Sequence, residues 1–267
     1  MCYSKEVQLI SALIILVSCL VYYLFYIKKF KDKWKVCFLR TVLIGFMCIG
    51  LHQFFEFLAL VTNNQIVYKM GLIISICAVY FLLKSLEVLS NKKIGSWIAL
   101  IFILFVILQI LIVPMDFSAS SFYLKHNSVF FWAAIWLLLF IYWHVCAIKI
   151  YFEMKDNKSK RTLVLYLLTI ADASFILSAI YVLFGYFFFS VNVCTDSPSI
   201  WCTFYVLQSF LVPFLFFKLF KFKRQKDTKF MEPKEILIYL IIALFILGVL
   251  MLILPLFNCL TWKFVFG

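Results

Sequence analysis

The sequence predicts an all-α, multi-pass membrane protein, a bundle of about eight transmembrane helices with both termini outside. Of its 267 residues, 66% are hydrophobic and 14% are charged, whereas soluble chains average about half and about a quarter. Apolar segments recur along the chain with only short polar separators. Inside a bilayer, helices satisfy their own backbone hydrogen bonds, so this pattern favours a helical bundle.

Each predicted span is long enough to cross a hydrocarbon core of about 30 Å as a helix. The eight segments are residues 7–27, 36–62, 66–89, 94–114, 128–152, 162–191, 198–218 and 236–257. We divide the chain into a seven-span membrane core, residues 1–220, and a C-terminal part, residues 221–267. The second part contains a basic loop, the eighth span and a short outer tail.

The Lys and Arg residues that give the chain its net charge of +13 are concentrated on one predicted side of the membrane. All but four of the 25 Lys and Arg residues lie in or beside alternate loops; the exceptions are Lys5, Lys69, Lys125 and Lys263. Loops rich in Lys and Arg remain on the cytoplasmic side, which places the protein in the cell membrane, the inner membrane if the source is bacterial. The basic loops then face anionic lipid headgroups, and we expect no nucleic acid partner.

A polar group interrupts the second span, where "HQFFEF" places His52, Gln53 and Glu56 in an apolar run. At about 100° per residue, His52 and Glu56 fall on one stripe of the helix, together with Gly45, Cys48 and Asn63. Ionisable side chains inside a membrane are costly and mark candidate functional sites. This pair can ligate a metal, act as a coupled acid and base, or hydrogen-bond a neighbouring helix, and these alternatives remain open.

Two more ionisable residues, His144 and Asp172, lie in the inner halves of the fifth and sixth spans. An imidazole beside a carboxylate lowers the cost of burying both, so we expect them to form an inner polar pair, with either a structural role or a role in a proton or ion path. Glu87 is different, because Lys84 precedes it by one helical turn and an ion pair explains it.

The predicted topology places four of the nine cysteines on or near the outer face of the membrane: Cys2, Cys194, Cys202 and Cys259. Four thiols in an oxidising compartment permit two bridges in three pairings. The chain has no GxxxxGK[ST], GxGxxG, GxSxG, HExxH or CxxC motif. The catalytic motifs typical of soluble enzymes therefore give no support to an enzymatic function.

Three short elements together resemble an uncharacterised family of bacterial multipass membrane proteins: "MCYS" at the N-terminus, "HQFFEF" in the second span and "SIWCTF" before a late span. Members begin Met-Cys-aromatic-Ser and carry [HQ]-Q-x-x-E and Ser-[VI]-Trp-Cys-x-Phe in the same places. The resemblance covers residues 1–220. The motif positions it marks in this chain are Cys2, Ser4, His52, Gln53, Glu56, Ser199, Trp201 and Cys202.

The resemblance implies that these residues converge on one outward-facing polar pocket. Two arrangements follow from it and remain open. Cys2 and Cys202 form a disulfide that holds the N-terminus over the bundle, or both thiols join His52 and Glu56 in a metal site. Sulfur and imidazole ligands together suit zinc or copper.

The sequence favours a non-enzymatic membrane protein over an enzyme. The leading hypothesis is a transport, receptor or sensory protein that binds a small ligand or ion in the outward-facing pocket. The first alternative is an intramembrane metal- or thiol-dependent hydrolase or transferase that acts on lipid. The second is a membrane scaffold.

Overall fold

The computed structural model of the chain describes residues 5–25, 27, 33–112, 117–119, 124–126, 130–189 and 200–224. Side chains are described in 5–25, 27, 33–112, 135–178, 180 and 204–216. These residues form seven helices: α1 (Lys5–Phe25), α2 (Lys33–Thr62), α3 (Gln65–Ser90), α4 (Ser96–Ile112), α5 (Phe130–Glu153), α6 (Lys158–Phe189) and α7 (Ile200–Arg224). They correspond in order to the first seven predicted spans.

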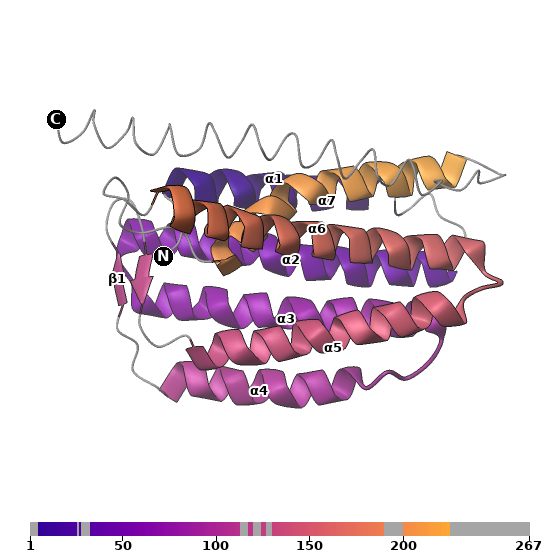
Figure 1. Cartoon of the computed structure of the whole chain (residues 1–267), viewed down its shortest axis with the longest axis horizontal. Coiled ribbons are helices and arrows are strands. Elements are labelled where there is room, and N and C mark those ends of the chain that lie inside the picture. The colour runs from indigo at the N-terminus through magenta and orange to yellow at the C-terminus, as the bar shows by residue number, and fades with distance from the viewer. Residues whose placement is uncertain are drawn as a thin grey trace.

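The helices lie side by side along one common direction (Figure 1). α2 is central, because it packs against α1, α3 and α7, and its contact with α3 is the most extensive in the bundle. α5 contacts both α3 and α6, whereas α4 lies at one edge against α3 and α5. The hydrophobic core runs through the centre of this arrangement.

Five helical segments are long and apolar enough to cross a membrane: α1, α2, α3, and the described parts of α5 and α6, residues 135–153 and 158–178. α4 and the segment of α7 from Phe204 to Phe216 are shorter apolar helices. Large apolar side chains of α4, among them Trp97, Phe105 and Ile112, are exposed, as expected of a surface that contacts lipid. The eighth predicted span lies outside the described residues.

α2 and α3 are joined by a tight turn built from two asparagines. Asn63 adopts φ 49°, in the left-handed region that Asn tolerates better than most residues. The Asn64 side chain caps α3 by accepting a hydrogen bond from the Ile66 backbone N–H at 2.8 Å. Because the turn is short, α3 returns antiparallel to α2.

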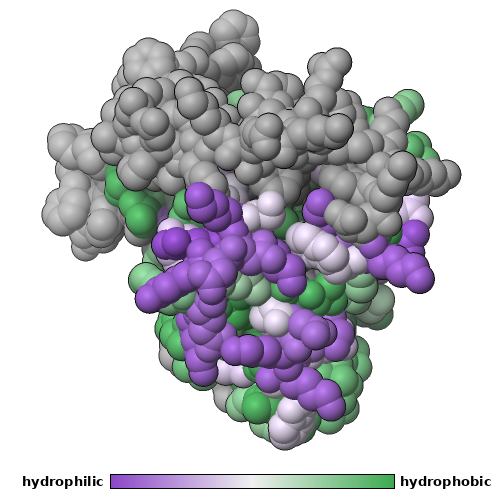
Figure 2. Space-filling view, turned by 90° about the vertical axis from the view of Figure 1, so that its right-hand side faces the viewer, coloured by the Kyte–Doolittle hydropathy of each residue, from purple (hydrophilic) through white to green (hydrophobic). Residues whose placement is uncertain are grey.

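Charged residues collect at the end of the bundle where α3 and α5 end and α6 begins; we call this the basic end. Figure 2 views this end and shows its hydrophilic surface. Lys92 pairs with Glu153 at 2.8 Å, and Lys84 pairs with Glu87 at 2.7 Å. Glu87 also accepts hydrogen bonds from the backbone N–H groups of Ile94, just before α4, and of Ser96, its first residue, so the predicted ion pair also has a capping role.

Two details of the fold differ from the predicted all-α bundle. The connection between α4 and α5 contains two short antiparallel strands, β1 (Phe117–Ala119) and β2 (Leu124–His126), with Phe117 opposite His126. We call this end of the bundle the hairpin end. At the basic end, α2, α6 and α7 continue several residues beyond the predicted apolar segments, because lysine side chains on a terminal turn can extend toward water.

Candidate functional site

The polar stripe of α2 lies in the interior of the bundle. His52, Gln53 and Glu56 are all buried, each with at most 2% of its surface exposed. They lie nearer the Thr62 end of α2, and this half of the helix packs between α1 and α3. The three predicted motif residues of the second span therefore share one buried region of the described bundle.

His52 is held in place by hydrogen bonding to the neighbouring helix. Its Nδ1 lies 3.0 Å from the backbone carbonyl of Gly71 in α3. Because a carbonyl only accepts, Nδ1 carries the proton and donates it. The other ring nitrogen, Nε2, lies 3.5 Å from Oε1 of Glu56. The fixed ring orientation thus directs Nε2 toward the carboxyl, and a proton can reside on either group.

Gly71 permits this contact because it has no side chain. A Cβ at this position would lie 3.1 Å from Cβ of Phe55 and 3.5 Å from Nδ1 of His52. Carbon atoms in ordinary contact are about 3.5–4.0 Å apart, so any larger residue would push α3 away from α2. Gly71 therefore sets the close approach that brings its carbonyl to the imidazole.

Two buried phenols complete the surroundings of the imidazole and carboxyl. The ring of Tyr205 from α7 lies 4.5 Å from the ring of His52, at 60° to it. Tyr68 from α3 is buried near the Glu56 carboxyl. The Tyr205 hydroxyl lies close to Ser75 and to the indole of Trp136. Ionisable groups of α2 are thus surrounded by polar groups of α3 and α7.

Two buried glutamines lie in the same part of the bundle. Gln8 from α1 lies beside the Glu56 carboxyl, and both Gln8 and Gln53 have no exposed surface. Within the described residues, neither the oxygen nor the nitrogen of either amide makes a hydrogen bond of good geometry. Buried polar atoms in native proteins are almost always paired, and exceptions often mark an ordered water or ion.

We call Gln8, His52, Gln53, Glu56, Tyr68 and Tyr205 the polar cluster. It combines one carboxyl, one imidazole, two amides and two phenols from four helices, α1, α2, α3 and α7. Its carboxyl, imidazole and phenol groups can donate and accept protons, and its carboxyl and amide oxygens can coordinate a small cation.

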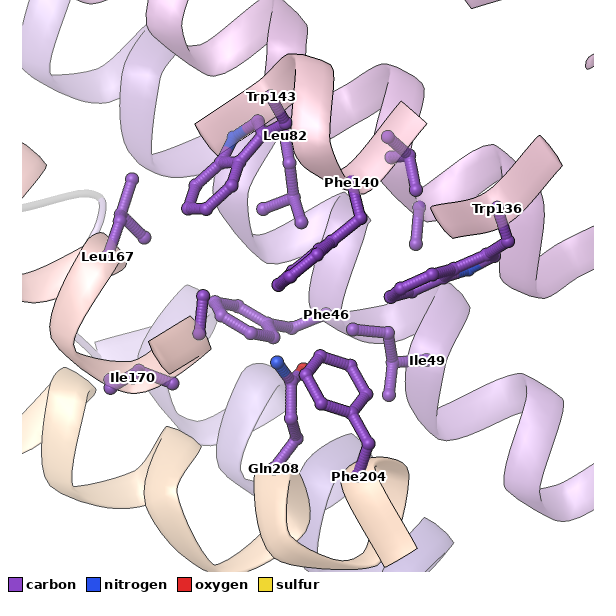
Figure 3. A pocket seen from close by; sticks show the side chains of 13 residues that line it. Phe46, Ile49, Leu82, Trp136, Phe140, Trp143, Leu167, Ile170, Phe204 and Gln208 are labelled. Atoms are coloured by element: carbon purple, nitrogen blue, oxygen red, sulfur yellow. The ribbon is translucent and has the colours of Figure 1, made fainter. Parts of the chain in front are cut away.

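A separate cavity lies nearer the basic end of the bundle, between α2, α3, α5, α6 and α7. It measures about 30 Å³ and is lined by Phe46, Ile49, Ala78, Val79, Leu82, Trp136, Phe140, Trp143, Leu167, Ile170, Ala171, Phe204 and Gln208. Figure 3 shows Trp136, Phe140 and Trp143 in a row from α5, facing Phe46, Phe204 and the Gln208 amide. Of the predicted site residues whose side chains the structure describes, none lines it. Its lining is mostly apolar, and the polar groups among the lining residues are the Gln208 amide and the indole N–H groups of Trp136 and Trp143.

The inner polar pair is formed by direct contact. Nε2 of His144 in α5 hydrogen-bonds to Oδ1 of Asp172 in α6. The His144 side chain is 19% exposed, whereas that of Asp172 is 49% exposed. The pair therefore joins the two helices at the surface of the bundle, unlike the buried polar cluster.

The remaining predicted site residues are not brought together by described contacts. Cys2, Ser4 and Ser199 lie outside the described residues. Trp201 and Cys202 belong to the first turn of α7, but their side chains are not described. The Cys2–Cys202 disulfide and the zinc or copper site therefore stay predictions. Among the described residues, no group of three His, Cys, Asp or Glu side chains is arranged to hold a metal.

Sequence reasoning missed Gln8, Tyr68, Tyr205 and Gln208. Gln8 and Gln208 carried a usable signal, because each is an amide inside a predicted span. The two tyrosines carried none, since tyrosine is common at span ends and this chain has 14.

Comparison with known proteins gives no match for this chain, whether to family models, to curated proteins or to solved structures.

Proposed function

We propose that this protein is a multi-pass cell-membrane protein that binds a proton or a small cation at the polar cluster, as a sensor or transporter. In this proposal the basic end faces the cytoplasm and its anionic lipid headgroups. The hairpin end faces outward, and the eighth span completes the bundle so that both termini lie outside. The distribution of Lys and Arg supports this orientation.

The observation that carries the proposal is the burial of Glu56 beside His52 and Gln8. A carboxyl and an imidazole in a bilayer are retained at considerable energetic cost. Both are fully buried here, with the imidazole nitrogen 3.5 Å from the carboxyl oxygen. The electrical charge of such a pair changes when a proton or a cation arrives or leaves, which makes the pair a suitable binding element.

The two amides favour a small, oxygen-seeking ligand. Gln8 and Gln53 offer buried carbonyl oxygens that make no hydrogen bond of good geometry within the described residues. Carboxylate and amide oxygens are ligands for hard cations. The same oxygens can also hold a water molecule that carries a proton to Glu56. The tight packing of Gly71 and Phe55 around the cluster favours an ion over a larger organic ligand.

Linkage between binding and stability provides the test. A ligand that binds the folded state alone stabilises it by about 2.7 kcal/mol at one hundred times its dissociation constant. We would measure the unfolding temperature in lipid nanodiscs over a pH series and, at fixed pH, over a series of lithium, sodium, potassium, ammonium, magnesium and calcium salts. Wild-type protein is expected to respond to pH, to one of these cations, or to both.

The matched variants are Glu56→Gln and Glu6→Gln. Glu56→Gln keeps the shape of the side chain and removes its titratable proton, so the response should be lost. Glu6 is an exposed carboxylate at the start of α1, and its replacement should leave the response unchanged. The proposal would be contradicted if the unfolding temperatures of wild type and Glu56→Gln changed identically in the pH series and in every salt series.

A further inference from the structure

Two half-buried cations, Lys160 and Arg161, lie in the first turn of α6 at the basic end of the bundle. This turn contains no acidic residue. The N-terminus of a helix already carries a partial positive charge, so basic side chains in a first turn are unfavourable. Their positions are better explained if a negative charge binds beside them.

Lys160 extends across the end of the bundle to α2 and α3. Its Nζ donates a hydrogen bond to the backbone carbonyl of Leu89, near the end of α3, at 2.7 Å. The same Nζ lies 5.0 Å from the ring centroid of Trp34, the second residue of α2. The Nζ of Lys35 lies 5.5 Å from that ring. Two ammonium groups from different helices therefore share one indole, although like charges repel each other.

Arg161 extends in the direction of α5. Its guanidinium carbon lies 4.3 Å from the ring centroid of Tyr151, near the end of α5, and its Nη2 donates a hydrogen bond to the Tyr151 hydroxyl at 3.1 Å. That bond uses one of the five guanidinium N–H groups. The buried Nε makes no hydrogen bond within the described residues. The ring therefore fixes the orientation of a guanidinium that keeps unused donors.

The described salt bridges at this end involve other lysines. They join Lys84 to Glu87 and Lys92 to Glu153. Within the part of the chain that the structure describes, no salt bridge includes Lys160 or Arg161. Figure 2 shows the hydrophilic side chains that gather over this end. An external anion is therefore a suitable counter-charge for the two cations.

The residues of this contact lie at one level of the bundle. Trp34, Leu89, Tyr151 and Arg161 are each within two residues of the end of the apolar run of their own helix. Trp and Tyr concentrate at the membrane–water interface, so this level is the depth of the lipid headgroups. Side chains lean toward the N-terminus of their helix, which directs Lys160 and Arg161 out of the apolar layer and toward the headgroups.

We propose that Lys160 and Arg161 of α6, together with Trp34 of α2, form a specific binding site for the phosphate of an anionic phospholipid. Basic pockets between transmembrane helices bind such headgroups. Arg161 donates hydrogen bonds to the phosphate oxygens, for which its planar fork is suited. Lys160 supplies a second positive charge, and the Trp34 indole packs against the glycerol region of the lipid.

The depth of the site favours a lipid over a soluble phosphate. Aromatic rings lie beside both cations, and they offer apolar surface that a lipid can contact and an inorganic ion cannot. The bound headgroup neutralises positive charge at the start of α6. The inference takes from the proposed function only that the basic end lies at a membrane surface, and it does not depend on the polar cluster.

The test is native mass spectrometry of the purified full-length chain, titrated in detergent with phosphatidylglycerol or with phosphatidylcholine of the same acyl chains. Wild type is expected to bind phosphatidylglycerol more tightly. Lys160→Gln and Arg161→Gln should each weaken this binding about fivefold, the factor that one basic residue contributes near an anionic lipid surface. Circular dichroism and unfolding temperature confirm that each variant is folded.

The matched control is the double variant Lys92→Gln, Lys93→Gln. It removes two positive charges at the same end, from exposed side chains, and should leave phosphatidylglycerol binding at the wild-type value. The double variant Lys160→Gln, Arg161→Gln should weaken binding about 25-fold. Arg161→Lys is the more conservative change for folding. It keeps the charge but loses the planar fork, so it should also weaken binding.

Three outcomes would overturn the inference. Equal binding of the two lipids by wild type would exclude a site for negative charge. Equal losses in the two double variants would show that the whole basic end attracts anionic lipid without a specific site. Release of the lipid by inorganic phosphate at equal concentration would assign the site to a soluble phosphate. Glu56-dependent stabilisation is measured separately, so none of these results decides the proposed function.

Discussion

Replacement of Gly71 by alanine tests the packing on which the polar cluster depends. The added Cβ would lie 3.1 Å from Phe55 Cβ, and 3.5 Å from both Nδ1 and the carbonyl oxygen of His52. Since a Cβ is fixed to its backbone, Phe55 cannot relieve the contact by rotating. α2 and α3 must therefore separate by a few tenths of an ångström.

The expected cost follows from three contributions. Overpacking of this kind costs about 1–3 kcal/mol. Separation of the helices also stretches the 3.0 Å hydrogen bond between His52 and the Gly71 carbonyl, and such a bond contributes about 0.5–1.5 kcal/mol. Alanine favours a helix by about 1 kcal/mol relative to glycine. We therefore expect Gly71→Ala to lower the free energy of unfolding by about 2 kcal/mol.

Gly45→Ala is the matched control on the same helix pair. A Cβ at Gly45 would meet the flexible end of Leu82 at 3.3 Å and the Ala78 carbonyl oxygen at 3.4 Å. The leucine can move, so the change should be close to neutral. The assay is unfolding in mixed detergent micelles, followed by tryptophan fluorescence. If Gly71→Ala is as stable as Gly45→Ala, the close approach of α2 and α3 at His52 is refuted.

Three other predictions concern the basic end, the inner pair and the metal. Glu87→Ala should lower the free energy of unfolding by about 1–2 kcal/mol, because two backbone N–H groups at the start of α4 lose their acceptor; Lys92→Ala, at an exposed ion pair, should have no measurable effect in the same unfolding assay. Asp172→Ala should lower the free energy of unfolding by about 1–3 kcal/mol, because the partly buried His144 ring loses its acceptor. Asp172→Asn keeps a side-chain oxygen that can accept, so equal stability of the two variants would contradict this. If the predicted zinc or copper site exists, elemental analysis of purified protein should find stoichiometric metal that His52→Ala removes, and metal-free wild-type protein would exclude it.

The helices could be predicted from the sequence because their signal is local. Each apolar run has the length of a membrane crossing, and lysines or asparagines separate one run from the next. The two asparagines after the second run mark the turn between α2 and α3, although Asn63 lies in this turn and not on the polar stripe of α2 where its helical phase had placed it. The two short strands between α4 and α5 could not be anticipated in this way, because three-residue strands carry too little pattern to distinguish them from a loop.

The candidate site was only partly accessible from the sequence. The helical phase of His52 and Glu56 showed that they share one face, and the positions of His144 and Asp172 in the inner halves of two spans suggested that they pair. The partners of His52 depend on how helices pack, which a uniformly apolar helix does not reveal. No feature of the sequence therefore indicated that Tyr205 belongs to the site. No feature indicated the aromatic cavity near Gln208 either.

The central claim is that Glu56 gains and loses a proton inside the folded bundle, and infrared difference spectroscopy measures this directly. The protein in lipid nanodiscs is titrated with acid while the C=O stretching band of protonated carboxyl groups is recorded, for wild type, Glu56→Gln and Glu6→Gln. The account predicts a reversible band at the position of a carboxyl shielded from water, present in wild type and Glu6→Gln and absent from Glu56→Gln. A titration in which Glu56→Gln and wild type give the same carboxyl bands would contradict it.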